Sequence, residues 1–426
     1  MKGAVDEALS HCNKCGFCLP TCPTYQVSLL ESLSPRGRLA LMQGLRNGEV
    51  EATGDVRRAL DLCLECRACE VACPSGVGFG HAIEETRSAQ GMTRAGLEWL
   101  WPLVRNRARF RHRVALGAAL ERAGLMGPAL AVGRRLGLVP PGPMVASLLR
   151  NLPGARRFRA LERMAEPAPR ATHAFFLGCV GDALFPHVNA DAITLLRAAG
   201  ARVALPGGQT CCGALFAHAG RHEEARACLA QNVEAFEGVP GPVVNVAGGC
   251  GAFLREAESA FGPQDPMRPR ARRLAQRVVD LSEALVALAP LRYRGRGRRV
   301  ALQDSCHLAN VARVTAAPRT LLDAVQGDER VELADAGACC GSAGSFSFSE
   351  PDMSRSVLER KLTFVRQSGV DTLLVENPGC ELQLRWGVEQ AGVGVEVLPV
   401  ATYLRQALIQ SAEARAGAEG TPCESG

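Results

Sequence analysis

Eight of the 18 cysteines in this 426-residue chain stand in two runs that share one spacing. The first run is HCNKCGFCLPTCP, residues 11–23, and the second is LCLECRACEVACP, residues 62–74. Both read C-x2-C-x2-C-x3-C-P, in which two-residue gaps let a tight loop turn successive thiolates toward one point. Clustered cysteines of this kind indicate metal or redox chemistry, with iron–sulfur clusters and structural zinc as the two candidates.

The spacing favours iron–sulfur clusters, because zinc sites use two separated C-x2-C pairs rather than three cysteines at consecutive gaps. In two-cluster ferredoxins the fourth cysteine of each run ligates the other cluster. The sequence therefore predicts two [4Fe–4S] clusters with crossed ligation. The predicted ligands are Cys12, Cys15, Cys18 and Cys73 for the first cluster, and Cys63, Cys66, Cys69 and Cys22 for the second.

A second cysteine pattern occurs twice in the C-terminal half: strand then Cys, loop then Cys-Cys-Gly, strand then Gly-Cys. Equivalent cysteines are offset by 127, 128 and 130 residues, which indicates an internal repeat. Adjacent cysteines rarely bridge each other because that disulfide is strained, but their thiolates can bind one multi-metal centre. The candidate ligands are Cys179, Cys211, Cys212 and Cys250 in the first copy, and Cys306, Cys339, Cys340 and Cys380 in the second.

The alternative for these eight cysteines is that they are small buried residues at tight turns, since free cysteine is commonly buried. Repetition of the whole set favours the metal interpretation. Gly213 and Gly341, which follow the cysteine pairs, would let the backbone wrap closely around a bulky inorganic ligand. Cys228 and Cys423 have no counterpart in the repeat and are predicted not to be ligands.

Two features of the second copy are each compatible with more than one role. His307 follows Cys306 where the first copy has Val180, and it suits a ligand, a proton donor, a hydrogen-bond donor to a cluster or a structural histidine. The segment CCGSAGSFSFSEP, residues 339–351, wraps a metal centre or serves only to cap a helix that begins at Pro351, with Ser349 or Glu350 as the cap.

The elements that position these cysteines follow from the apolar pattern and the turn residues. From residue 171 onward, short β-rich runs alternate with helical ones, which predicts parallel α/β units with the cysteines at strand ends, where ligands bind. In the N-terminal part, Ser34, Pro35 and Gly48 predict the cap, first residue and end of a helix.

The expected fold is α+β and multidomain, with a mostly helical two-cluster ferredoxin domain, a basic helical connector and two tandem α/β Cys-Cys-Gly repeats. The expected boundaries are residues 1–90, 91–170, 171–290 and 291–413, followed by a disordered tail at 414–426.

Positive charge gathers in the connector. Residues 91–170 contain fifteen Arg, no Lys and four Glu, a net charge of +11, whereas the whole chain carries +6. Arginines interleaved with Trp99, Trp101 and Phe110 suit an anionic membrane surface or an acidic partner subunit, and a solvated face is the plain alternative. Nucleic acid binding has little support and is not expected, because no recognised fold or aromatic platform accompanies the charge.

Other function classes lose support from what the chain does not contain. The N-terminus lacks an apolar signal-peptide core, and no apolar run approaches the length of a membrane span, so a reducing cytoplasm is expected, with peripheral contact to the inner face of the membrane as an alternative. Neither a G-x-G-x-x-G after a strand nor a Walker A motif is present. No catalytic residue is assigned, and the expected role is electron transfer.

The motifs resemble those of a known family. CNKCGFCLPTCPTYQ, SPRGRLALMQ, CLECRACEVACPSGV, CCGSAGSFS and NPGCELQL resemble the iron–sulfur subunit of bacterial glycolate oxidase, over nearly the whole chain and in the same order. The resemblance implies a subunit of an oxidoreductase complex, in which flavoprotein subunits oxidise glycolate or a related 2-hydroxy acid. This chain would carry the electrons toward a quinone or another membrane acceptor.

Relatives with this layout serve D-lactate or glycerol-3-phosphate oxidation, and the sequence does not choose among these substrates. A heterodisulfide-reductase-like thiol or disulfide enzyme and a zinc-stapled scaffold are further alternatives. The first loses support because that reductase has a C-x2-C pair at the last cysteine of each domain. Here the flanking residues are Ala247 and Phe253 in the first copy, and Asn377 and Gln383 in the second.

Overall fold

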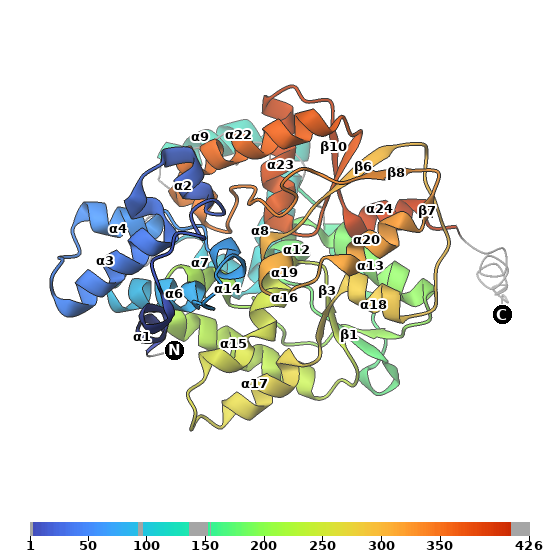
Figure 1. Ribbon diagram of the computed structural model, residues 1–426. Helices are drawn as coiled ribbons and strands as arrows, with labels where there is room; N and C mark the ends of the chain where they lie inside the picture. Colours follow the sequence, from blue (N-terminus) through green and yellow to red (C-terminus); the bar gives the residue numbers. More distant parts are fainter. Residues whose placement is uncertain (1–2, 93–96, 136–151, 154, 410–426) are drawn as a thin grey trace, which may run out of the picture.

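The computed structural model describes residues 3–92, 97–135, 152–153 and 155–409, and Figure 1 shows them arranged as three neighbouring bodies around a central junction. The N-terminal body is helical, as predicted. Its helices are α1 (Ala4–His11), α2 (Pro23–Ser28), α3 (Pro35–Asn47), α4 (Gly54–Asp61), α5 (Ala68–Val71) and α6 (Phe79–Ala89), with the 3₁₀ turn η1 (Glu31–Leu33) between α2 and α3.

Helix α3 begins and ends where its sequence indicates. The Ser34 hydroxyl accepts a hydrogen bond from the Gly37 amide, Pro35 occupies the first helical position, and Gly48 takes a left-handed conformation at the end. Buried Leu39 and Met42 on this helix join a core with Leu60 and Ile83. The helices therefore form a small shell around the two cysteine loops.

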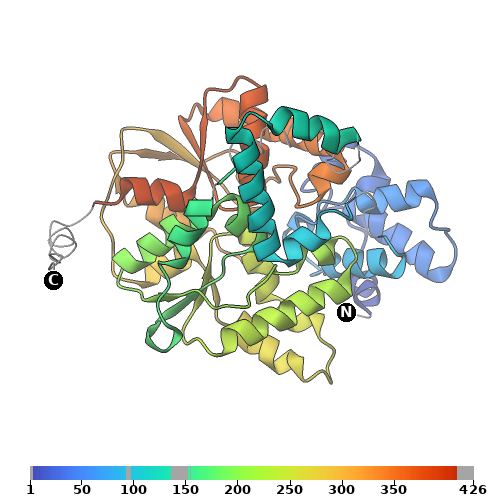
Figure 2. The same cartoon turned by 180° about the vertical axis from the view of Figure 1, so that it is seen from behind.

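The connector contributes helices α7 (Trp101–Arg105), α8 (Arg107–Arg122), α9 (Met126–Arg135) and α11 (Ala155–Glu162), and the 3₁₀ turn η2 (Ala168–Arg170) follows. Figure 2 shows α8 crossing the face of the first repeat. It packs on α12 (Cys179–Leu184), where the wholly buried Asp182 carboxylate pairs with Arg107 at 2.8 Å and with Arg111.

The connector's aromatic residues also face the protein. Trp101 is buried against Phe216, with the Arg221 guanidinium over its ring. Arg105, Arg109 and Arg113 remain exposed. The basic segment therefore uses part of its charge and its apolar surface to dock on the first repeat. Among the described residues, no helix has the length and hydropathy to cross a membrane.

The first repeat is a parallel four-stranded sheet in the order β2-β1-β3-β4. Its strands are β1 (His173–Phe175), β2 (Val203–Ala204), β3 (Val243–Asn245) and β4 (Val278–Asp280). Its other helices are α13 (Pro186–Ala198), α14 (Ala214–His218), α15 (His222–Glu237), α16 (Gly248–Arg255), α17 (Met267–Ala275) and α18 (Leu281–Ala287), with the 3₁₀ turn η3 (Ala257–Ala260).

The second repeat has the same arrangement, because its parallel sheet reads β8-β6-β9-β10 in the same direction. Its strands are β6 (Arg299–Gln303), β8 (Glu329–Val331), β9 (Thr372–Val375) and β10 (Glu396–Pro399). Its helices are α19 (Cys306–Asn310), α20 (Ala316–Asp323), α21 (Phe346–Ser349), α22 (Pro351–Ser368), α23 (Pro378–Gln390) and α24 (Val400–Ala407). A short ribbon pairs β5 (Tyr293–Arg294) with β7 (Val325–Gln326).

The two repeats share one core. Leu196 of α13 and Val244 of β3 belong to the same buried cluster as Leu302 of β6 and Leu404 of α24. Because apolar side chains of both sheets are buried together, the two repeats hold a fixed mutual orientation. That orientation sets how their cysteine loops meet. The predicted tail at 414–426 lies outside the described residues.

Candidate metal centres

The two ferredoxin-type loops have matching backbone geometry. Lys14 and Glu65, the second residue of the first gap in each run, take positive φ angles of 54° and 53°. Gly16 and Arg67, the first residue of the next gap, do the same at 91° and 57°. Left-handed residues at equivalent places turn successive cysteines to one side, at a cost that a bound group offsets.

The loops bring together the cysteines of both crossed sets. A cavity of about 30 Å³ is lined by cysteines of the first predicted set, and one of about 20 Å³ by the second. The fourth cysteine of each run lies with the other run, and Cys69 borders both cavities. The first cavity is lined by Cys12, Cys15, Cys18, Cys69 and Cys73, and the second by Cys22, Cys63, Cys66 and Cys69.

Arg38 lies beside Cys22, the fourth cysteine of the first run. Its guanidinium is almost fully buried and lies 3.9 Å from the Cys22 Sγ, while it donates to the Leu33 and Ala59 carbonyls. A buried arginine beside a thiolate stabilises the charged form that binds metal. The sequence motif SPRGR therefore supplies both a helix start and a charge partner.

The four cysteines of the first repeat form a chain of thiols at the carboxyl edge of its sheet. The Sγ atoms of Cys179 and Cys211 are 3.6 Å apart, and the Gly213 amide donates to Cys211 at 3.4 Å. Hydrogen bonds from Cys211 and Cys250 hold the pKa of Cys212 well below its usual value, although burial opposes this. The pKa values of its partners Cys211 and Cys250 shift the opposite way and are raised.

The second repeat gathers its own set in the same way. The Sγ atoms of Cys340 and Cys380 are 3.2 Å apart, and the Gly341 amide donates to Cys339 at 3.4 Å. A hydrogen bond with Cys339, together with burial, raises the pKa of Cys306.

The glycine after each cysteine pair fills a place that no side chain fits. Gly213 and Gly341 have φ angles of 105° and 87°. A Cβ would lie 2.9 Å from the Ala225 carbonyl in the first case and 2.5 Å from the Ser354 carbonyl in the second. The backbone must therefore pass close to the following helix, and only glycine permits this.

The sequence missed how near the second repeat's set lies to the ferredoxin loops. Cys66 shares a buried cluster with Cys339 and Cys306, and the charges of these three thiols influence one another. Asn310, on the helix that begins at Cys306, donates to the Cys66 carbonyl at 2.8 Å. Three cysteine sets thus follow one another, from the partly exposed set of the first ferredoxin loop to the second repeat's set.

The cysteine loops of the two repeats also touch. The Gly248 amide donates to the Glu376 carbonyl at 3.0 Å, and the Gly249 amide donates to the Asn377 side-chain oxygen at 3.2 Å. Asn377 and Gln383 stand at the two positions where a cysteine would form a C-x2-C pair with Cys380. The Gln383 amide donates to Ser354 at 2.9 Å, so it supports the loop.

Cys228 and His307 also have defined places. Cys228 is buried in α15, and its assignment as a non-ligand stays a prediction. The Nδ1 atom of His307 lies 3.7 Å from the Cys306 Sγ. Burial lowers the pKa of His307 to about 3, so the ring is neutral. Cys423 lies outside the described residues. Glu350 stands at the cap position of α22, one of the two residues predicted for it.

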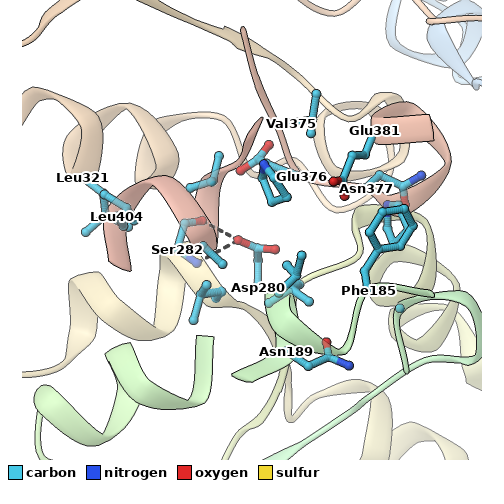
Figure 3. Close-up of a pocket in the computed structure, with 18 residues that line it drawn as sticks. Phe185, Asn189, Asp280, Ser282, Leu321, Val375, Glu376, Asn377, Glu381 and Leu404 are labelled. Atoms are coloured by element: carbon cyan, nitrogen blue, oxygen red, sulfur yellow. Dashed lines mark hydrogen bonds between the residues drawn. The ribbon is translucent and has the colours of Figure 1, made fainter. Parts of the chain in front are cut away.

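A separate cavity between the repeats is a packing feature. Figure 3 shows the Asp280, Glu376 and Glu381 carboxyls lining it, with Asp280 bonded to Ser282. Its volume of about 30 Å³ accommodates one water molecule at most. Burial raises the pKa of Asp280 and Glu376, so these carboxyls are adapted to the interior between two sheets.

Comparisons with known proteins agree with this architecture. The model of the 4Fe–4S dicluster domain matches residues 8–77, and the model of the cysteine-rich domain matches twice, at 173–255 and 300–385. The double match confirms the internal repeat. The chain is therefore an iron–sulfur protein, and the converging thiols, the positive-φ loop residues and the two glycines fit such clusters.

Two relatives match nearly the whole chain, and a shorter one matches about half of it. The "Probable glycolate oxidase iron-sulfur subunit" of Bacillus subtilis is 35% identical over 96% of both chains. The "Glycolate oxidase iron-sulfur subunit" of Escherichia coli is 28% identical over 89% of this chain and 90% of that one. "Lactate utilization protein A" of Shouchella clausii is 30% identical over 54% of this chain and 97% of that one.

A solved structure, of a hypothetical protein from Helicobacter pylori, has a TM-score of 0.54 at 9% identity, over 98% of this chain and 74% of that one, which is a likeness of fold alone. The domain order, the repeated cysteine pattern and the full-length match to the B. subtilis protein agree with one another. On these grounds the chain belongs to the family of glycolate oxidase iron–sulfur subunits.

Proposed function

We propose that this chain is the electron-transfer subunit of a flavin-dependent 2-hydroxy-acid dehydrogenase complex of the glycolate oxidase type, acting between flavoprotein subunits and a quinone or other membrane acceptor. The observation that carries the proposal is the series of cysteine sets. One set reaches the surface at the exposed Cys15, and the next is buried at Cys22, Cys63 and Cys66. The second repeat's set then adjoins Cys66.

Each cluster, when bound, supplies one-electron redox chemistry. The first would be held by Cys12, Cys15, Cys18 and Cys73, and the second by Cys63, Cys66, Cys69 and Cys22. The eight cysteines of the two repeats would hold further centres, four in each repeat. Backbone amides such as those of Gly213 and Gly341 donate to sulfur and stabilise the added charge.

Some residues around the cysteine sets suit contact with a partner subunit, and others exclude water from the inner sets. Phe17, between Cys15 and Cys18, is 66% exposed, and an exposed aromatic residue beside a cysteine set suits contact with a partner subunit. Buried Leu33, Leu62 and Phe346 exclude water around the inner sets. The partner would perform hydride abstraction from the substrate, which is flavin chemistry.

The first experiment is a count of iron, acid-labile sulfide and zinc on anaerobically purified full-length chain, followed by low-temperature EPR after dithionite reduction. About eight irons, with signals from interacting centres, support the two crossed clusters. About sixteen mean that both repeats are loaded as well. Zinc in place of iron, without visible absorbance, contradicts the proposal.

The second experiment identifies the complex. The loaded chain is mixed with candidate flavoprotein subunits from the same organism, and glycolate, D-lactate or glycerol 3-phosphate is added under anaerobic conditions. Bleaching of the visible absorbance with only one of these substrates identifies the substrate. If the flavin is reduced by every substrate offered and the visible absorbance never changes, the electron-transfer role is wrong.

A further inference from the structure

A cavity of about 1010 Å³ lies where the N-terminal body meets the two repeats. Its polar lining comes from all three bodies. Among the polar residues are Glu65, Arg67, His81 and Glu84 from the N-terminal body, His218, His222 and Glu256 from the first repeat, and His307 from the second. This convergence of histidines and carboxylates is not used by the cysteine sets themselves.

Each wall of the cavity continues into a cysteine set. Glu65 lies between Cys63 and Cys66, and His218 ends the short helix that follows Cys212 and Gly213. His307 directly follows Cys306. A molecule bound here would therefore lie beside three of the four sets at once, which is where an acceptor of their electrons would need to lie.

The carboxylates fix one histidine. The Nδ1 atom of His218 lies 2.6 Å from a Glu65 oxygen and 2.7 Å from a Glu84 oxygen. The contact with Glu84 is a hydrogen bond and the contact with Glu65 is an ion-pair distance, so two carboxylates hold this ring in place. The fully buried Arg87 guanidinium anchors Glu65 and donates to the His218 carbonyl at 2.8 Å.

One ring atom of His218 is available to a ligand. Because Nδ1 of His218 is committed to the carboxylates, its Nε2 is the atom left for another partner. The Nε2 atoms of His222 and His307 are buried and have no hydrogen-bond partner among the described residues, which is uncommon in a folded protein.

The rest of the lining combines charged and apolar residues. Asp6 and Arg46 are among the charged ones, and Val5, Met42, Leu45 and Phe253 form an apolar and aromatic wall. The His218 ring stacks on His307 at a centroid distance of 5.4 Å and meets the edge of Phe253 at 6.3 Å. A planar ring would find flat faces and apolar contacts here, with polar atoms at one end.

We propose that this cavity binds a quinone and that His218, held by Glu84, donates a hydrogen bond to one of its carbonyl oxygens. The inference rests on the proposed function, which supplies the electrons. Reduction adds two electrons and two protons, so that each C=O becomes C–OH. The doubly protonated His218 ring, with its Nδ1–H on Glu84 and its Nε2–H on the quinone oxygen, gives up the Nε2 proton and becomes neutral. Solvent protons that reach the cavity supply the second proton and reprotonate His218.

The volume separates this ligand class from the small acids of the upstream reaction. A cavity near 1,000 Å³ matches sites for drug-sized ligands, whereas a two-carbon hydroxy acid would leave most of it unfilled. A quinone ring with a short side chain makes use of both the histidine end and the apolar wall.

The test measures menadione, a tailless quinone, with the full-length protein in two ways. Equilibrium dialysis of the oxidised protein gives the dissociation constant. Stopped-flow mixing of the dithionite-reduced protein gives the reoxidation rate with menadione and, separately, with ferricyanide, which takes one electron and no proton. The variants are His218→Gln, Glu84→Gln and Ala89→Trp, which fills the exposed rim, with His187→Gln outside the cavity as the control.

We expect His218→Gln to slow reoxidation by menadione at least about tenfold while ferricyanide stays within about twofold, because only quinone reduction requires the proton. Glu84→Gln should have a smaller effect in the same direction. Ala89→Trp should weaken menadione binding at least about fivefold, because it occupies the entrance. His187→Gln should match the wild type in all three measurements.

Three outcomes overturn the inference: menadione binding unchanged in Ala89→Trp, equal slowing of both acceptors in His218→Gln, or His218-dependent reoxidation by a disulfide such as glutathione disulfide but not by menadione. Failure of the proposed function has a different signature, namely protein without reducible iron. Dialysis still tests the cavity in that case, because it requires no electron transfer.

Discussion

The first and second Cys-Cys-Gly repeats have the same strand order and the same four cysteines, but they meet different neighbours. In the first, Cys179 is followed by Val180, and the connector covers the neighbouring α12 through Asp182. In the second, Cys306 is followed by His307, and the set adjoins Cys66 of the N-terminal body. The two repeats therefore share the strand order and cysteine positions that bring the thiols together, and they differ in the elements packed around those thiols.

The difference assigns unlike roles to like folds. Under the proposed function the second repeat is the one to exchange electrons with the N-terminal loops, because its thiols share a buried cluster with Cys66. The first also contacts the N-terminal body, but through the pairs Arg67–Glu256 and Glu65–His218 rather than through its thiols. A fold repeated within one chain therefore extends a series of sites without needing a second subunit.

The largest expected effect comes from removing equivalent cysteines. Cys340→Ser and Cys212→Ser should each lower the iron content by about four atoms per chain, because each repeat would lose the ligand set of its own centre. Cys340→Ser should also slow substrate-driven reduction of the cavity-bound quinone several-fold more than Cys212→Ser does, because the second repeat's thiols share a buried cluster with Cys66. Iron assay and anaerobic stopped-flow spectroscopy measure the two effects.

Cys228→Ser is the matched control, because Cys228 is buried in the first repeat outside the thiol chain. Its iron content should equal that of the wild type. Equal electron-transfer losses in the Cys212 and Cys340 variants would remove the distinction between the repeats.

The next effect concerns the contact that only the first repeat makes. Asp182→Ala removes the wholly buried carboxylate that pairs with Arg107 and Arg111. Breaking a buried pair leaves uncompensated charge, so the free energy of unfolding should fall by about 3–5 kcal/mol. Urea unfolding followed by tryptophan fluorescence measures it, since Trp101 lies in the connector.

Arg109→Ala provides the comparison, because Arg109 is exposed on the same helix as the paired arginines. Its effect should stay within about 0.5 kcal/mol. A loss in Asp182→Ala as small as this would mean that the connector does not depend on the pair.

The glycines test how closely the two cysteine loops are constrained. Gly341→Ala and Gly213→Ala both force a left-handed alanine into the backbone, at about 1–2 kcal/mol. The closer contact at Gly341, 2.5 Å to the Ser354 carbonyl, should bring its total to about 3 kcal/mol and make it the more harmful of the two. Thermal unfolding gives the order.

Gly48→Ala separates backbone strain from crowding, because Gly48 has a φ of 70° and nothing within 4 Å of its missing Cβ. It should lower the free energy of unfolding by only about 1 kcal/mol. If all three variants unfold at the same temperature, the short Cβ contacts at Gly213 and Gly341 do not affect stability.

The smallest effect is a pH dependence in the first repeat. Burial and the nearby Arg157 and Arg385 lower the pKa of His187 to about 4. Between pH 4 and 6.5 the unfolded chain binds a proton that the folded chain does not, so stability rises with pH through this window. The contribution of His187 to stability is complete above about pH 6.5 and is lost as the pH falls toward 4.

His187→Gln should reduce the gain in free energy of unfolding between pH 4 and 6.5 by roughly 1–2 kcal/mol, a value lowered to allow for the partial exposure of the ring. Urea unfolding at several pH values between 4 and 7 measures it. An unchanged slope in the variant would assign the pH dependence to other groups.

The sequence by itself determined the features that depend on local spacing. Two-residue gaps bring three cysteines onto one loop, Ser34 and Gly48 bound a helix, and equal offsets reveal the repeat, because these properties belong to short segments. The crossed placement of Cys22 and Cys73 also follows from the two runs alone.

Only the tertiary structure decided which distant segments meet. Glu65, Glu84 and His218 carry no mutual spacing signal, since α6 and α14 lie far apart in the sequence and pack together only when the bodies assemble. Asp182 likewise gives no sign in the sequence that it binds the connector. Such contacts depend on how buried surfaces fit, and local patterns do not encode that fit.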